Sequence, residues 1–212
     1  MLSPGSTQPR RIPCQERGER RVAELLEAAE SVIAEAGYEA ATMSAIAERA
    51  AAPIGSLYQF FPCKAAITQA LRAAYSKQFE ATCAPLIEEA RTLSLRRFVS
   101  RLIDLTTAFV DSHPAFPALL DAPRSTRSSP AVRRPLLERF AGLFLIRQPR
   151  MSKVKARQLA VVTMQIIKAL NLLYTELPRE ERDAFVREYK IVLYSYLNAR
   201  VESRAGARGE RV

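Results

Sequence analysis

The stretch that decides the fold of this chain is Thr42–Lys64, which reads TMSAIAERAAAPIGSLYQFFPCK. Its apolar spacing predicts a short amphipathic helix over Thr42–Ala50, a tight connection at Ala51–Ile54 and a second short helix over Gly55–Phe60. Two short helices joined by about four residues are the signature of a helix-turn-helix, whose second helix enters the major groove of DNA. The sequence therefore predicts a DNA-reading element near its N-terminus.

Composition predicts an all-α fold for the whole chain. The chain has 212 residues, of which 48% are hydrophobic and 25% charged, enough for one large domain or two small ones. Glycine is sparse, and runs such as AELLEAAESVIAEAG and ARQLAVVTMQIIKALNLLYTEL are rich in strong helix formers. No stretch alternates between apolar and polar residues well enough to predict a strand. We expect about nine helices.

Several classes of protein and site are excluded by what the chain lacks. No window approaches the roughly 18 uncharged apolar residues of a membrane span, and the first residues lack the apolar core of a signal peptide. The three cysteines, Cys14, Cys63 and Cys83, are odd in number and far apart, so we expect no disulfide framework and a cytoplasmic location. With His113 as the only histidine, we expect no metal site and no cofactor.

The charge of +10 is unevenly distributed along the chain. Basic and acidic residues balance over residues 1–80, so the whole excess lies in residues 81–212. The run Arg124–Arg157 holds ten basic residues and one acidic residue. The expectation of DNA binding therefore rests on the local motif and not on bulk charge. The proline- and glycine-rich residues 1–17 predict a flexible arm, and residues 203–212 a flexible tail.

Proline and glycine set the expected ends of the helices. A first helix is expected from about Glu19 until Gly37 ends it. The helix that starts near Lys64 is expected to be interrupted or ended by Pro85, with the next helix over 86–112. The remaining helices are expected at Pro114–Leu120, 130–146, 152–177 and 179–201.

The first four expected helices resemble those of the TetR family of bacterial transcription repressors. The match spans about Arg20 to Leu71. It rests mainly on Gly55–Lys64, which follows the family pattern Gly-x-Leu-Tyr-x-(His or Tyr)-Phe-x-x-Lys. Phe60 departs from this pattern, because the family usually carries His or Tyr there. The rest of the chain resembles the family only in its helical plan.

The resemblance implies that residues 18–65 form a DNA-binding domain of three helices. Tyr58 and Lys64 can reach phosphates. Gln59 can bond adenine in a bidentate way, and Ile54 can contact a thymine methyl group. The implied DNA-binding residues are Thr42, Ile54, Gly55, Ser56, Tyr58, Gln59, Phe60 and Lys64.

The resemblance also implies that residues 66–202 form a larger helical domain that binds an effector and makes a homodimer. The candidate lining of the effector pocket is Tyr75, Phe79, Phe98, Phe109, Phe116, Phe140, Phe144, Met164 and Tyr174. The helix at 152–177 is apolar on more than one side, as a helix buried all round must be. With its successor it predicts a four-helix interface between two subunits. The candidate interface residues are Leu170, Leu173, Phe185, Tyr189, Val192 and Tyr196.

The sequence thus predicts a homodimeric repressor that a small molecule releases from its operator. The effector is expected to be mainly apolar, with an anionic group favoured over a cationic one because of the basic run. A helical enzyme is the first alternative, but the chain has no Gly-rich phosphate loop and no nucleophile with an evident base. The second is a helical adaptor that binds an acidic partner through Arg124–Arg157. Redox sensing by Cys63 also stays open.

Overall fold

The computed structural model describes residues 13–90, 92–122 and 130–202. Within these residues the chain is all-α, as expected, with nine α-helices and a final π-helical turn. Residues 1–12 and 203–212, which carry most of the expected arm and the tail, lie outside the described part. The helices are α1 (Pro13–Ala40), α2 (Met43–Arg49), α3 (Ile54–Phe60), α4 (Lys64–Glu89), α5 (Leu95–Ser112), α6 (Phe116–Asp121), α7 (Pro130–Arg147), α8 (Lys153–Glu176) and α9 (Arg179–Leu197).

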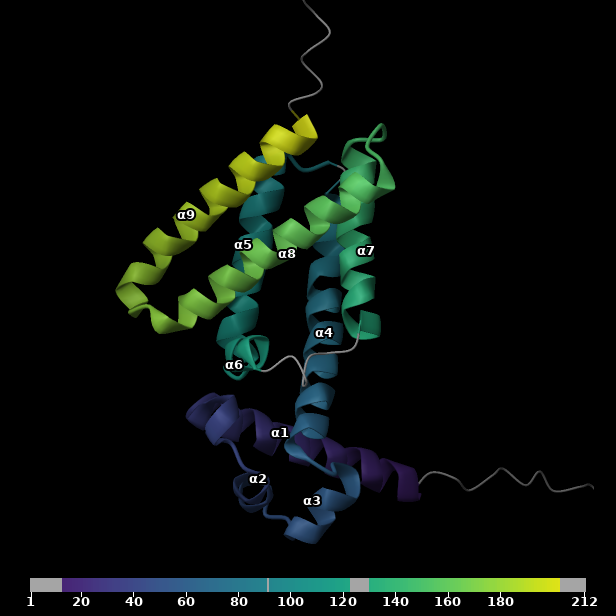
Figure 1. Cartoon of the computed structure of the whole chain (residues 1–212), viewed down its shortest axis with the longest axis vertical. Helices are drawn as coiled ribbons and strands as arrows, with labels where there is room; N and C mark the ends of the chain where they lie inside the picture. Colours follow the sequence, from purple (N-terminus) through teal and green to yellow (C-terminus); the bar gives the residue numbers. More distant parts are fainter. Residues whose placement is uncertain (1–12, 91, 123–129, 203–212) are drawn as a thin grey trace, which may run out of the picture.

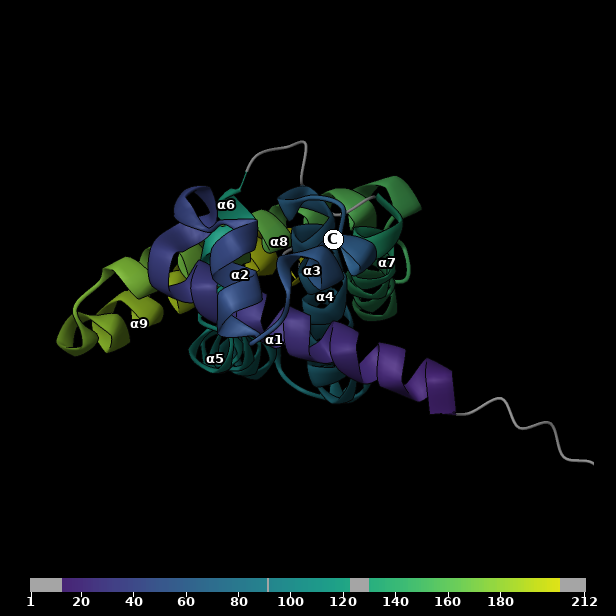
Figure 2. The same cartoon turned by 90° about the horizontal axis from the view of Figure 1, so that it is seen from below.

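The helices form two parts that share α4 (Figure 1). The lower part contains α1, α2 and α3, and Figure 2 looks onto this end of the molecule. The upper part is a bundle in which α7 and α8 pack together and α9 lies against α5 and α8. The short helix α6 contacts α1, α4 and α8. It therefore lies at the junction between the two parts.

The first helix starts earlier than the sequence indicated. It begins at Pro13 and not near Glu19, which suits a proline because the first turn of a helix does not use the missing N–H group. Its expected end at Gly37 is confirmed as a break in the helix: Gly37 has φ 76° and ψ 167°, a conformation open to glycine and strained for other residues. One further helical turn follows, closed by a bond from the Ala41 N–H to the Gly37 carbonyl.

The expected effect of Pro85 is wrong. The helix α4 passes through Pro85 and ends at Glu89, so the next helix begins at Leu95, capped by Ser94, and not at residue 86. An interior proline removes one backbone bond and costs about 3 kcal/mol. Cys83 and Leu86 beside it are buried in the core, and the packing of this segment outweighs the local cost.

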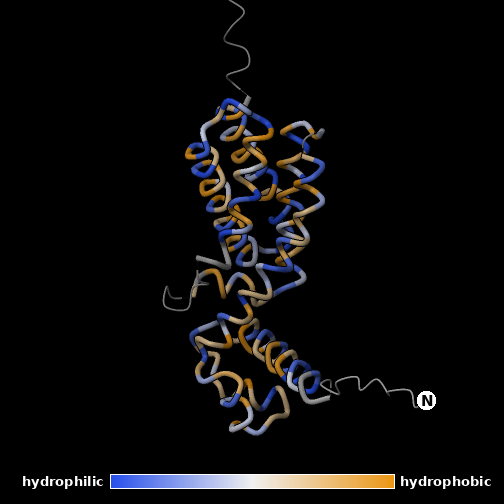
Figure 3. Tube along the Cα trace, turned by 90° about the vertical axis from the view of Figure 1, so that its right-hand side faces the viewer, coloured by the Kyte–Doolittle hydropathy of each residue, from blue (hydrophilic) through white to orange (hydrophobic). Residues whose placement is uncertain are grey.

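One contiguous core runs through both parts of the molecule. Figure 3 shows hydrophobic positions recurring along the helices of both parts. The buried face of α4 passes from Ile67 and Leu71, at the level of α1, to Phe79 and Leu86 inside the bundle. Any displacement of this helix is therefore felt in both parts, because cores packed at crystal-like density do not deform freely.

The turn between α2 and α3 is built on an unusual residue. The Ala52 N–H bonds the Ala47 carbonyl and the Ala51 N–H bonds the Glu48 carbonyl, the pair of bonds that defines a Schellman motif. The motif needs a left-handed residue, and Ala51 takes that position with φ 46°. Glycine is the usual residue there because it has no Cβ.

We predict that Ala51→Gly raises the free energy of unfolding by about 0.5–1 kcal/mol. Relief of the left-handed alanine contributes about 1–2 kcal/mol, and the greater freedom of glycine in the unfolded chain offsets part of it. Chemical denaturation checks the change. The matched control is Ala50→Gly, because Ala50 has φ −81° and gains nothing from glycine. Equal destabilisation by both variants would contradict the prediction.

Candidate DNA-binding site

The helix α3 is anchored on one face and open on the other. Leu57 and Phe61, four residues apart, are buried in the core of the lower part. Tyr58 and Gln59 are exposed away from these anchors, and Ile54 is exposed at the first position of the helix. This amphipathic arrangement fixes the helix by its inner face and leaves the outer one free to contact a partner.

The candidate DNA-binding residues of α3 fall almost entirely on its exposed surface. Phe60 is exposed at one flank of the helix, and Ser56 is half-buried. None of the seven residues of α3 carries a charge. Direct phosphate pairing by a cation must therefore come from neighbouring elements, whereas α3 offers amide, hydroxyl and apolar groups, which read base edges. The contacts with DNA themselves stay a prediction.

Gly55 has no packing role within the chain. A Cβ atom built on it would meet no other atom within 4 Å, and the residue lies exposed in the first turn of α3. Glycine lowers the stability of a helix relative to alanine. The fold therefore does not account for glycine here, but a closely approaching partner would.

Thr42 caps α2 as expected. Its Oγ1 accepts a bond of 3.1 Å from the Ala45 N–H, which leaves its own O–H group as a donor at the exposed start of the helix.

The other end of α2 is tied to α1, where Arg49 donates to both carboxylate oxygens of Glu35 at 2.7 and 2.6 Å. This bond holds the pKa of Glu35 below its usual value. Both residues are exposed, so the pair orients α2 more than it stabilises the fold.

Lys64 has a role that the sequence did not reveal. Its Nζ donates to the carbonyls of Tyr38 at 2.9 Å and of Glu39 at 3.0 Å, and lies 4.5 Å from the centre of the Tyr38 ring. The ammonium group thus holds the turn that follows Gly37 against the start of α4. An ammonium has three donors, so a phosphate contact through the third remains compatible with this arrangement.

Several candidate pocket residues gather at the junction between the two parts. The rings of Tyr75, Phe79, Phe109 and Phe116 meet edge-to-face, with centroids 5.1–6.2 Å apart. His113 stacks on Phe109 at 4.1 Å. Burial, and next the Glu30 carboxylate of α1, raise the pKa of the Tyr75 phenol. The Tyr75 hydroxyl has no hydrogen-bond partner. Glu30 therefore raises this pKa as a nearby negative charge, which disfavours the phenolate. The cluster therefore links the bundle to α1.

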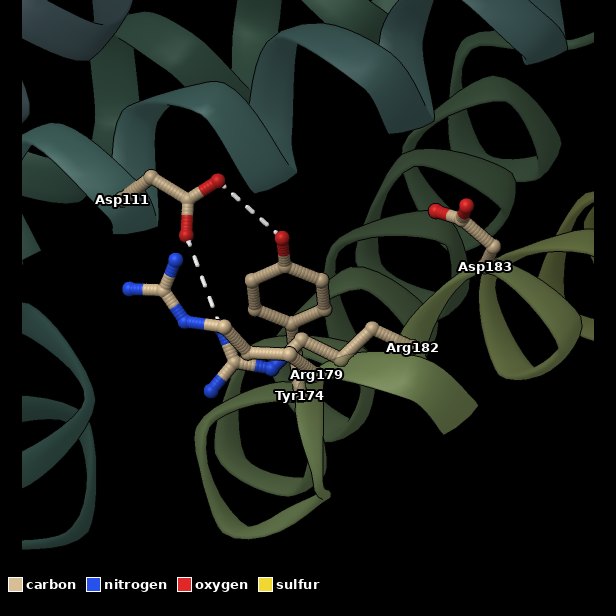
Figure 4. Close-up of a pocket in the computed structure, with 5 residues that line it drawn as sticks. All are labelled: Asp111, Tyr174, Arg179, Arg182 and Asp183. Atoms are coloured by element: carbon tan, nitrogen blue, oxygen red, sulfur yellow. Dashed lines mark hydrogen bonds and ion pairs between the residues drawn. The ribbon is translucent and has the colours of Figure 1, made fainter.

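The other candidate pocket residues are dispersed. Phe98, Phe140 and Phe144 are fully buried in the bundle core, and Met164 is half-buried. Tyr174 borders a hollow of about 450 Å³ at the tip of the α8–α9 hairpin, lined by Asp111, Tyr174, Arg179, Arg182 and Asp183 (Figure 4). This hollow is polar and open, so it does not match the aromatic pocket that the sequence predicted.

Contacts inside that hollow link Asp111, Tyr174 and Arg182. The Tyr174 hydroxyl donates to Asp111 Oδ2 at 3.0 Å. Arg182 lies 3.9 Å from the Asp111 carboxylate and stacks on the Tyr174 ring. Burial, and next the bond to Asp111, raise the pKa of Tyr174. Asp183 stands apart from this group (Figure 4). The arrangement joins α5, α8 and α9.

One candidate interface residue is placed differently from the rest. Leu170 has no exposed surface, so it belongs to the core of its own chain and is unavailable to a partner. Apolar side chains nevertheless reach the surface on both α8 and α9. The α8 stripe consists of Val162, Ile166, Ala169 and Leu173, and the α9 stripe of Phe185, Tyr189, Val192 and Tyr196, all half-buried or exposed.

The basic run does not form a uniform cationic surface in its described part. Arg139 pairs with Glu80 at 2.7 Å, and Arg157 lies 3.7 Å from Glu138. Arg147 turns inward and donates to the Leu93 carbonyl at 2.5 Å. Residues 123–129, which include two of its arginines, lie outside the description. Intrachain contacts thus occupy several of the charges on which the adaptor alternative depends.

The described residues contain neither a membrane-spanning helix nor a cluster of metal-binding side chains. No helix in that part of the chain is long and apolar enough to cross a membrane. No group of three or more metal-binding side chains comes together there.

Cys63 and Cys83 differ in exposure. Cys83 is buried, which raises the pKa of its thiol to about 12 and makes it unreactive. Cys63 is exposed at the start of α4.

A small helical domain with an exposed second helix of a helix-turn-helix, joined to a larger helical bundle, defines a DNA-binding regulator. Two family models match the chain. Residues 25–71 match "Bacterial regulatory proteins, tetR family", and residues 94–197 match "Tetracyclin repressor-like, C-terminal domain". Together they span most of the sequence. The chain belongs to the TetR family of transcriptional regulators, which are not enzymes.

Solved structures share this fold at low sequence identity. A TetR-family regulator from Streptomyces coelicolor is 23% identical, with a TM-score of 0.64 over 85% of this chain and 99% of that one. The regulator FadR from Bacillus subtilis, in complex with stearoyl-CoA, is 17% identical, with a TM-score of 0.59 over 82% and 97%. A gamma-butyrolactone receptor is 20% identical, with a TM-score of 0.52 over 86% and 100%. No curated protein matches the sequence.

We predict that Gly55→Ala separates stability from DNA binding. The change should leave the fold intact or stabilise it by about 0.5 kcal/mol, because alanine is the better helix former. It should weaken operator binding by about tenfold, which is about 1.4 kcal/mol, because the added methyl group stands on the reading face. Gly142→Ala in α7 is the matched control, since Gly142 also has open space around it. The prediction fails if both variants bind operator alike in a mobility-shift titration.

Proposed function

We propose that the chain is a homodimeric repressor that reads an operator with α3 and releases it when a small molecule binds the larger domain. The observation that carries the proposal is the outer face of α3, which is exposed, uncharged and rich in groups that contact base edges. Two copies of α3, held about 34–36 Å apart, would enter successive major grooves.

The apolar stripes on α8 and α9 support a dimer as the functional state. Residues at intervals of three and four lie on one side of a helix, so each stripe is a continuous apolar surface about three turns long. Leu173 and Val192 are exposed within these stripes. Packed against their equivalents in a second copy, the two helices make a four-helix interface with closed two-fold symmetry.

A mainly apolar effector is supported by the bundle and by two similar structures. One of these was solved with stearoyl-CoA and another is a gamma-butyrolactone receptor. The interior of the bundle is mainly aromatic and aliphatic, which is also the usual character of the residues that line ligand pockets. The effector releases DNA if it binds better to a state in which α4 holds the two reading helices at another spacing.

The operator experiment uses full-length protein and an operator selected from random DNA. We predict that Gln59→Ala loses about 1–3 kcal/mol of affinity, mainly at one base position, because an amide reads a base edge. Tyr58→Phe should weaken binding to all sequences alike, because its hydroxyl reaches phosphate. Fluorescence anisotropy against the operator and its single-base variants measures both. Lys77→Ala, on an exposed position of α4 remote from α3, is the control. If neither variant differs from it, α3 is not the reading helix.

The dimer experiment uses two neighbouring residues of α9. Val192, in the α9 stripe, is 51% exposed, and Ile191, on another side of the helix, is 56% exposed. We predict that Val192→Glu shifts the protein to monomers, because a charge in an apolar interface is costly, while Ile191→Glu leaves the dimer intact. Light scattering at micromolar concentration measures both. A monomeric wild type, or equal effects of the two variants, would refute the interface.

A further inference from the structure

The inner face of α8 carries two polar side chains inside the bundle core. Thr163 is 0% exposed and Asn171 is 2% exposed. Both belong to the row of buried residues that α8 packs toward α5, α6 and α7, which otherwise consists mainly of alanine, leucine and isoleucine. Burying a polar group in such surroundings destabilises a fold unless the group has a hydrogen-bond partner.

One oxygen atom of each side chain has no such partner. Thr163 Oγ1 and Asn171 Oδ1 are buried without a hydrogen bond. Other buried threonines show the usual arrangement: the Thr106 hydroxyl donates to the Leu102 carbonyl at 2.7 Å, and that of Thr68 to the Lys64 carbonyl at 2.8 Å. The large majority of buried side-chain polar atoms are hydrogen-bonded in folded proteins. Two unsatisfied groups on one face of one helix therefore indicate a place where another molecule completes the bonds.

The charge of the core restricts what that molecule can be. Among the described residues, the buried side chains include one with a formal charge, Arg72, and its guanidinium contacts the Leu119 carbonyl next to α6. No carboxylate is buried in the described bundle. A cation brought against the inner face of α8 would find no buried carboxylate there, and an anion would find only Arg72, whose guanidinium already bonds the Leu119 carbonyl. Either ion would lose its hydration with little compensation, which costs far more than burying a neutral hydroxyl.

We propose that the effector is an uncharged, mainly apolar molecule whose hydroxyl, amide or carbonyl groups bond Thr163 and Asn171. The Asn171 oxygen accepts from an O–H or N–H of the ligand, and the Thr163 hydroxyl donates or accepts. Eight residues of helix separate the two by about 12 Å, so an elongated molecule with a polar group toward each end fits both. This inference rests on the proposed function, because it describes the ligand of the same domain.

The first arm of the test measures stability without any ligand. Thr163→Val and Asn171→Leu remove unpaired polar atoms while keeping the number of side-chain heavy atoms and their branching, so each should raise the melting temperature of the full-length protein by about 2–4 °C. Thr106→Val is the matched control, because Thr106 is equally buried but hydrogen-bonded, and it should not raise the melting temperature. If Thr163→Val lowers the melting temperature as far as the control does, its hydroxyl has a partner and the proposal is overturned.

The second arm measures binding with four probes that share a ten-carbon chain: 1,10-decanediol, 1-decanol, sebacate and 1,10-diaminodecane. We expect the diol to raise the melting temperature of the wild type most, with a dissociation constant at least fivefold below that of the monoalcohol. Thr163→Val or Asn171→Leu should remove that advantage, while Thr106→Val should keep it. The proposal is overturned if neither alcohol stabilises the wild type, if a charged probe binds most tightly, or if both α8 variants keep the preference for the diol.

The same proteins separate this inference from the proposed function. Operator binding by the unliganded wild type and by the three variants tests the repressor. If they bind operator and sebacate alone releases it, the repressor stands and the uncharged effector is refuted. If none binds any selected DNA, the proposed function fails, whichever probe occupies the bundle.

Discussion

The packing of α4 into two neighbouring cores is the constraint on which the rest of the structure depends. Ile67 and Leu71 are buried at the level of α1, while Phe79 and Leu86 are buried in the bundle. A single rigid helix therefore belongs to both parts, and neither part can change its packing around α4 without moving the other. Coupling between a ligand and DNA requires an element whose position both sites bias, and in the proposed mechanism α4 is that element, because it is packed into both cores.

Local signals predicted the DNA-reading end well. The cap at Thr42, the break at Gly37 and the buried Leu57 are each encoded within a few residues of the feature they produce. Turn chemistry, helix capping and amphipathic spacing act over one or two helical turns. A single sequence contains all that is needed to recognise them. The all-α class followed for the same reason, because helix propensity is a local property.

Long-range packing accounts for what the sequence could not predict. The path of α4 through Pro85, the burial of Leu170 and the bonds from Lys64 to the turn after Gly37 depend on residues far along the chain. Aromatic or apolar character identifies candidate pocket residues as core positions but does not distinguish one part of a core from another. The unpaired oxygens of Thr163 and Asn171 on α8 can be recognised only in the folded chain, because they are defined by the absence of a partner among all neighbouring residues.

The absence of charge on α3 affects how a regulator of this kind would locate its site in a chromosome. Non-specific attachment to DNA is driven by the release of counterions from phosphates, and only basic side chains release them. A reading helix without a cation adds nothing to this counterion-driven attachment at random sequences, where only the neutral phosphate contact expected of Tyr58 would act, yet it contributes fully where the base edges match. The ratio of specific to non-specific affinity, which governs occupancy among millions of competing sites, is thereby raised. A smaller fraction of the protein would then be bound non-specifically elsewhere on the chromosome, and a larger fraction would be available to the operator.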